Sequence, residues 1–159
     1  MKSLKKLFPV AFVLISQAAC SKTSVPAVPN EPTPKDTTVA LLESSDWHIT
    51  TLTVTPAQNG VTDVWASLPP CLTDNFFRFK AGGIFNSDEG LTKCNPAIPQ
   101  IDEGTWSYID GSKLLNFNSQ GWQNRKLNIT ATTSTTISGT DDKVENGVAY
   151  TYTITLTKQ

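Results

Sequence analysis

The sequence predicts an all-β domain, folded as an eight-stranded antiparallel up-and-down barrel with long loops at one end. From about Leu41 onward, Thr, aromatic and β-branched residues recur, and apolar residues alternate with polar ones as in half-buried strands. Tight turns and longer connections also alternate along this part of the chain. Alternate connections of an up-and-down meander emerge at the same end, so the long loops should gather at one open end.

The first residues have the features of an export signal. A basic start over residues 1–6 precedes an apolar segment over residues 7–15. That segment is too short for a transmembrane helix, which needs about 20 residues, but it suits a signal peptide. Cys20 follows two alanines, an arrangement that resembles a bacterial lipobox. The resemblance implies removal of residues 1–19 and acylation of the Cys20 thiol, palmitate being one such acyl chain. An ordinary signal peptide with an incidental cysteine is the alternative.

A tether is predicted between Cys20 and the barrel. Residues 20–40 carry four prolines among polar residues, which favours an extended polyproline-type segment. The domain should then span residues 41–159. Such a tether would hold the domain away from a membrane to which the lipid on Cys20 is attached.

The charge of the chain limits its partners. Without residues 1–19 the chain carries ten basic and fourteen acidic residues, a net charge of −4. This balance argues against nucleic-acid binding and against a polybasic membrane patch. We therefore expect a monomeric cell-envelope protein whose membrane contact is the lipid. No acidic run of the kind that resembles a surface-export signal follows Cys20, which favours the periplasmic side of an outer membrane.

The elements of the domain follow from the same patterns. Residues 39–45 should form a short helical turn that leads into the first strand. The strands are predicted at 47–55, 75–80, 84–88, 103–109, 113–118, 121–130, 132–138 and 147–157. The last has the clearest alternation, with large apolar residues from Val148 to Leu156 on one face and Ala or Thr on the other. Long loops are predicted at 56–74, 89–102 and 139–146, and these three loops and their edges hold most of the acidic residues.

Two cysteines remain in the domain. Cys71 and Cys94 lie in the first two long loops, and in an exported protein such a pair is expected to form a disulfide. Both loops belong to the predicted open end, so the bridge would fix the largest loop over the opening. No CxxC spacing or EF-hand spacing occurs, and His48 is the single histidine, so no metal site is expected.

Several short motifs together resemble a known family. Trp47 opens the first strand, Phe-Lys-Ala-Gly-Gly-Ile-Phe spans residues 79–85, and Gly-Thr-Trp ends at Trp106. Asp-Glu-Gly at 88–90 precedes Lys93-Cys94, and Asp-Gly-Ser-Lys-Leu-Leu spans 110–115. Their order and spacing resemble the lipocalin-like domain family of small lipoproteins from Gram-negative bacteria, over about residues 41–157. The resemblance implies an eight-stranded barrel and binding of a small apolar ligand, with no established catalytic residues.

The function predicted from these residues is non-catalytic binding of a small hydrophobic or amphipathic molecule in the open end of the barrel. No nucleophile–base pattern accompanies His48, so no enzyme activity and no cofactor are expected. The aromatic ligand-binding candidates are Trp47, Trp65, Phe77, Phe79, Phe85, Trp106, Tyr108, Tyr150 and Tyr152. The same side chains could instead fill the barrel, with Trp65 and its neighbours plugging the end. The alternative function is then an envelope module with a solid core that contacts another protein through its loops.

Overall fold

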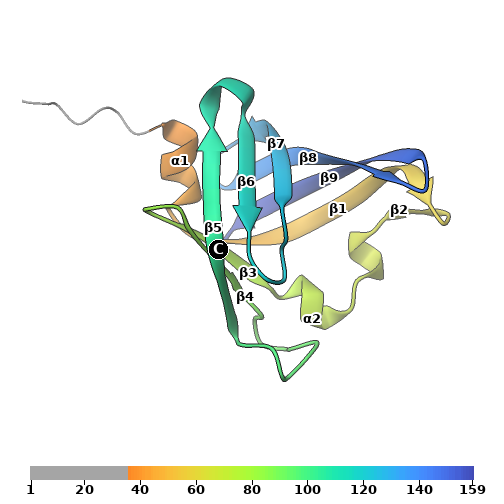
Figure 1. Cartoon of the computed structure of the whole chain (residues 1–159), viewed down its shortest axis with the longest axis horizontal. Coiled ribbons are helices and arrows are strands. Elements are labelled where there is room, and N and C mark those ends of the chain that lie inside the picture. The colour runs from red at the N-terminus through yellow and green to blue at the C-terminus, as the bar shows by residue number, and fades with distance from the viewer. Residues whose placement is uncertain (1–35) are drawn as a thin grey trace, which may run out of the picture. The chain divides into compact units, whose positions relative to one another are not determined.

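The computed structural model describes residues 36–159, which form a closed antiparallel barrel (Figure 1). The predictions for the signal peptide, Cys20 and the tether up to residue 35 lie outside the described residues. The strands are β1 (Asp46–Gln58), β2 (Val61–Asp63), β3 (Phe76–Lys80), β4 (Ile84–Asp88), β5 (Ile101–Ile109), β6 (Leu114–Asn118), β7 (Arg125–Thr132), β8 (Thr136–Glu145) and β9 (Val148–Lys158).

Strand order confirms the predicted up-and-down barrel. Each strand from β3 to β8 pairs with the next, and β1 closes the ring by pairing with both β3 and β9. The short β2 is an additional strand that folds back on the second half of β1 and was not predicted. Each of the eight predicted strands corresponds to one of the remaining observed strands, and in most cases the ends differ by a few residues.

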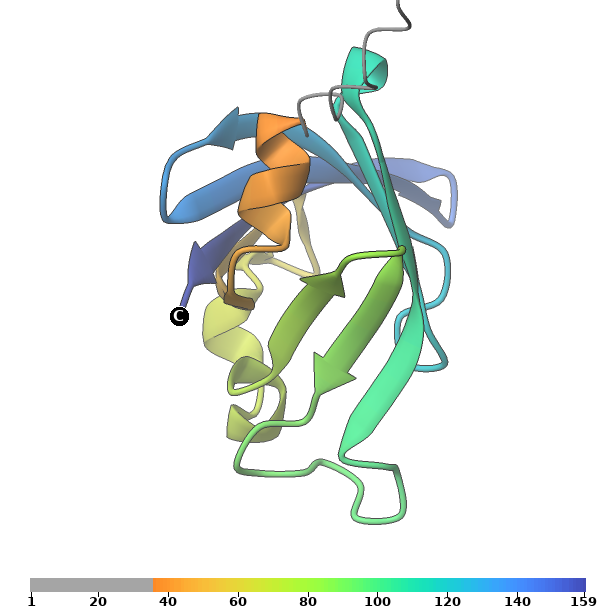
Figure 2. The same cartoon turned by 90° about the vertical axis from the view of Figure 1, so that its left-hand side faces the viewer.

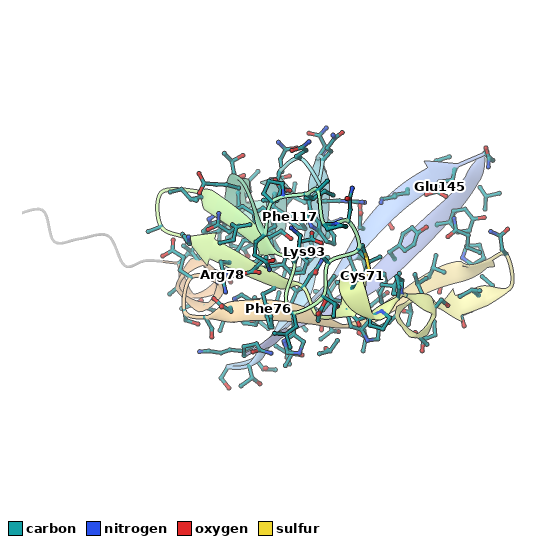
Figure 3. All side chains as sticks on the ribbon, turned by 90° about the horizontal axis from the view of Figure 1, so that it is seen from below. Cys71, Phe76, Arg78, Lys93, Phe117 and Glu145 are labelled. Atoms are coloured by element: carbon teal, nitrogen blue, oxygen red, sulfur yellow. A yellow bond between two sulfur atoms is a disulfide. The ribbon has the colours of Figure 1, made fainter. Side chains whose placement is uncertain are left out.

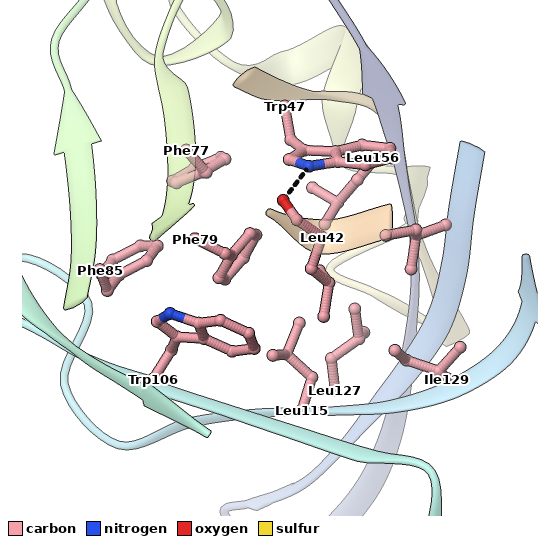
Figure 4. Close-up of a cluster of buried hydrophobic side chains, with 11 residues drawn as sticks. Leu42, Trp47, Phe77, Phe79, Phe85, Trp106, Leu115, Leu127, Ile129 and Leu156 are labelled. Carbon is pink, nitrogen blue, oxygen red and sulfur yellow. Dashed lines mark hydrogen bonds between the residues drawn. The ribbon is translucent and has the colours of Figure 1, made fainter. Parts of the chain in front are cut away.

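Helix α1 (Thr37–Leu42) closes one end of the barrel (Figure 2). The Asp36 carboxylate caps it by accepting hydrogen bonds from the amides of Thr38 and Val39, at 2.7 and 3.3 Å. Leu42 is fully buried, and its carbonyl oxygen accepts a 2.9 Å hydrogen bond from the indole nitrogen of Trp47 (Figure 4). The helix starts two residues before the predicted turn, so the last residues assigned to the tether belong to it.

The core fills the half of the barrel next to α1. Its fully buried side chains include Trp47, Phe85, Leu115 and Ile137, from four different strands. Figure 4 shows Phe77, Phe79, Phe85 and Trp106 grouped opposite Trp47 and Leu42. Gly139 is required here, because a Cβ at this position would meet the side chain of Leu127 and the carbonyl oxygen of Asn128.

A β-bulge in β1 sets which residues face inward. Ile49 pairs with Leu156 and Thr51 with Thr155, so Thr50 is an extra residue in the ladder. The Thr50 hydroxyl bonds Thr157 Oγ1 at 2.8 Å on the neighbouring strand. Because of the extra residue, Ile49 and Leu52 both line the interior although they are an odd number of positions apart.

The prediction of a long loop at 139–146 was wrong, because most of this segment belongs to strand β8. Strands β8 and β9 stay paired from Thr136–Thr157 to Glu145–Val148, and a two-residue turn, Asn146-Gly147, joins them. Both turn residues have positive φ, 51° and 80°, which is the backbone of a tight hairpin. Asp141, Asp142 and Glu145 therefore lie on a strand and not in a loop.

An ion-pair network joins the outer faces of three strands. The Arg78 guanidinium on β3 lies 2.8 Å from carboxylate oxygens of both Asp46 on β1 and Asp88 on β4 (Figure 3). Partial burial opposes ionisation of Asp88, but hydrogen bonds from Arg78, Gln100 and the Gly90 amide hold its pKa below the ordinary value. Among residues 36–159, none of the helices has the length and apolar content to cross a membrane.

Candidate functional site

A cavity of about 290 Å³ lies between the core and the end of the barrel opposite α1. Its walls are mostly apolar, and they come from the inner faces of the strands and from two connections at this open end. The lining residues are Ile49, Leu52, Trp65, Leu68, Leu72, Phe77, Phe79, Phe117, Trp122, Arg125, Lys126, Leu127, Asp141, Lys143, Tyr152, Ile154 and Leu156.

One wall of the cavity is an aromatic cluster. Trp122, in the connection from β6 to β7, packs edge-to-face on Phe77 with ring centroids 4.9 Å apart. Its indole nitrogen donates a 3.0 Å hydrogen bond to the hydroxyl of Ser87, which is itself buried. Phe117 packs against Trp122 and Phe79, at centroid distances of 6.4 and 6.1 Å. These contacts fix the wall in place without a ligand.

Residues 64–73, which we call the lid, cover part of the opening. They include the 3-10 helix η1 (Trp65–Ser67) and the helix α2 (Pro70–Thr73). The lid contributes Trp65, Leu68 and Leu72 to the lining, and Leu72 remains 40% exposed. The start of the lid is held by Asp63, whose carboxylate accepts a 3.1 Å hydrogen bond from the Ala66 amide.

The predicted disulfide is confirmed and lies at the lid (Figure 3). Cys71 in α2 is bonded to Cys94 in the connection from β4 to β5, with Cα atoms 5.1 Å apart. Next to it, the Asp74 carboxylate accepts hydrogen bonds from the amide and the hydroxyl of Thr92, both at 2.8 Å. Burial opposes ionisation of Asp74, but the Thr92 bonds outweigh it and lower the pKa of this carboxyl. The lid is thus tied to the neighbouring loop twice.

Charged side chains occupy the outer part of the cavity. Arg125 begins β7, and its guanidinium carbon lies 5.8 Å from the centroid of the Trp122 ring. Lys143 on β8 places its Nζ 5.4 Å from the Tyr152 ring and 3.6 Å from an Asp141 carboxylate oxygen. Arg and Lys over aromatic faces are stabilised by the ring quadrupoles. Two cations at the opening, Arg125 and Lys143, therefore each pack over an aromatic ring of the cavity wall.

A polar chain follows the outermost part of the same wall. The Tyr152 hydroxyl donates to Gln58 Oε1 at 3.1 Å, and Gln58 Nε2 donates to Glu145 at 2.7 Å. Partial burial, and then the charge of Glu145, raise the pKa of Tyr152. The phenol is therefore a neutral group at neutral pH, and it orients the ring as part of the cavity wall.

The structure brings some of the predicted ligand-binding residues together. Trp65, Phe77, Phe79 and Tyr152 line the cavity. The remaining candidates lie elsewhere: Trp47, Phe85 and Trp106 are buried in the core, Tyr108 packs against that core, and Tyr150 lies near the tip of the β8–β9 hairpin.

Charged lining residues were not singled out from the sequence. Arg125 shares the alternation of Leu127 and Ile129, which are both buried on β7, and this signal could have placed it on the inner face. Trp122 was not among the ligand-binding candidates named from the sequence either.

In the described part of the chain, the other titratable groups form no comparable site. Within residues 36–159 no group of three or more His, Cys, Asp or Glu side chains is arranged to hold a metal ion. His48 packs edge-to-face on Phe76, at a centroid distance of 6.4 Å, and its Nδ1 is 3.5 Å from Gln159 Nε2.

No protein-family model matches the chain, and no curated protein matches it significantly. The geometry of the cavity is therefore the basis for a functional proposal.

Proposed function

We propose that this protein binds a small hydrophobic or amphipathic molecule in the open end of its barrel, without catalysis. The observation that carries the proposal is the apolar cavity with preformed aromatic walls beneath a cross-linked lid. Ligand pockets are typically concave and mostly apolar, with a few polar groups, and their volumes start at about 300 Å³. The alternative of a solid barrel that contacts another protein through its loops leaves this hollow without a role.

Binding would be driven by burial of apolar surface. Each Å² of ligand and wall removed from water contributes about 25 cal/mol, and a prearranged wall reduces the ordering cost of binding. Trp65 and Trp122 lie in the lining, so their fluorescence should respond to a ligand, whereas Trp47 and Trp106 lie outside it. Saturable quenching by one apolar dye per chain is the expected result of a titration.

Filling the cavity should abolish this binding. Ile154 lines the cavity on β9, and Thr153 beside it is exposed on the outer face of the same strand. We expect Ile154→Trp to weaken binding of an apolar dye by about tenfold or more in calorimetry, because the larger side chain occupies the ligand's space. Thr153→Trp adds the same indole outside the barrel and should leave the affinity unchanged. Equal affinities for the two folded variants would contradict the proposed site.

We further propose that the domain is held at the cell envelope by a lipid on Cys20. The support is the N-terminal sequence alone, in which Cys20 closes a short apolar segment after two small residues. The mass of the N-terminal peptide from membrane-purified protein should show an acylated Cys20 and no residues 1–19. An unmodified thiol or retained residues 1–19 would contradict the anchor and leave the cavity proposal unaffected.

A further inference from the structure

Building on the proposed binding function, we propose that the cavity selects a single-chain amphiphile with a carboxylate end. The apolar chain would lie against the aromatic wall, and the carboxylate would lie at Arg125. Three features of the described residues lead to this inference: the local charge of the cavity, the surroundings of Arg125, and the internal neutralisation of Lys143.

The charge of the cavity is opposite to that of the domain. Residues 36–159 carry eight basic and thirteen acidic residues. Among the side chains that line the cavity, three are basic and one is acidic. With three cations and one carboxylate in its lining, the hollow should attract negatively charged molecules although the domain as a whole is acidic.

Arg125 has no anionic partner in the described part of the chain. Its Nε is buried and makes no hydrogen bond there, and no carboxylate lies within ion-pair distance of its guanidinium. The side chain lies over Trp122, which Ser87 fixes, so the cation is positioned before a ligand arrives. A partly desolvated donor without an acceptor is costly, and a carboxylate is the group that matches a guanidinium in geometry and charge.

The other two cations of the lining differ from Arg125. Lys143 lies 3.6 Å from Asp141, which balances its charge. Lys126 touches the lining only at its edge and is exposed, so water solvates its charge. Arg125 is therefore the uncompensated cation that faces the hollow. Lys80 is its control, because it is an exposed cation on β3 that lies outside the lining.

The test compares three ten-carbon probes that differ only at one end: decanoate, 1-decanol and decylammonium. Calorimetry with the purified protein at pH 7.5 should show decanoate binding about tenfold more tightly than 1-decanol, with decylammonium weakest, because a charge-assisted hydrogen bond adds to the same apolar burial. Arg125→Gln should reduce decanoate affinity about tenfold and leave 1-decanol unchanged. Lys80→Gln, outside the lining, should leave both affinities unchanged.

The outcomes separate this inference from the function on which it rests. If none of the three probes binds, the proposed function fails together with the inference. If 1-decanol binds as tightly as decanoate to the unaltered protein, the cavity function stands and carboxylate selection is overturned. If decanoate is preferred but the folded Arg125→Gln protein keeps that preference, the role of Arg125 is overturned.

Discussion

Replacing Trp47 with alanine is expected to lower the free energy of unfolding by about 3–5 kcal/mol, as is usual for the loss of a buried aromatic side chain. The side chain is fully buried where α1, β1 and the core meet. Its removal would also leave the carbonyl oxygen of Leu42 without the 2.9 Å hydrogen bond from the indole. Urea denaturation followed by far-UV circular dichroism measures the change without relying on tryptophan emission.

Trp65→Ala is the matched control for this prediction. Trp65 is only half-buried, and it lies in the lid and not in the core cluster. Its removal should lower the free energy of unfolding by about 1 kcal/mol or less, while weakening ligand binding because a cavity wall is lost. Similar destabilisation by the two substitutions would show that the end covered by α1 is not the main source of stability.

Much of the barrel could be predicted from the sequence because its strands alternate clearly. On β9 the large apolar residues from Tyr152 to Leu156 line the cavity and Thr occupies the other face. The outer part of β8 was misread, since Asp is depleted in strands and three acidic residues lie close together there. Pairing with the aromatic and β-branched residues of β9 overrides that preference, and the Asn146-Gly147 turn was the local signal of the hairpin.

The cavity was harder to predict. The alternation of apolar and polar residues indicates which side chains face inward, but it does not indicate how far along the barrel axis each one lies. Phe77 and Phe85 both face inward, yet Phe77 borders the hollow and Phe85 lies wholly in the core. Which of them is free to meet a ligand depends on strand register, on the bulge at Thr50 and on how far α1 fills its end. These are tertiary features that local patterns do not determine.

The disulfide should make the second large contribution to stability. Cys71→Ala/Cys94→Ala is expected to lower the free energy of unfolding by about 3.4 kcal/mol, because the bond closes a loop with a sequence separation of 23 and so restricts the unfolded chain. The double substitution is preferred to a single one, since a lone cysteine could form a disulfide between two molecules. Urea denaturation with and without reductant measures the effect.

The same protein under reducing conditions provides the control. Reductant should lower the stability of the unaltered chain to that of Cys71→Ala/Cys94→Ala, and it should not affect the double variant. If the unaltered chain keeps its full stability after both thiols have been shown to be reduced, the bond does not stabilise the fold.

Hydrogen exchange can separate the effect of the bond on the unfolded chain from its effect on the lid. The Asp74–Thr92 hydrogen bonds remain after the disulfide is lost, but they join the lid to its neighbouring loop at one point only. Residues 64–73 and 89–100 should therefore exchange much faster in the double variant than the global destabilisation predicts. Ligand should also dissociate faster, because Trp65 and Leu68 then leave the cavity more often. Exchange that rises only by the global amount would mean that the lid is held by its own packing, with the disulfide acting through the unfolded state alone.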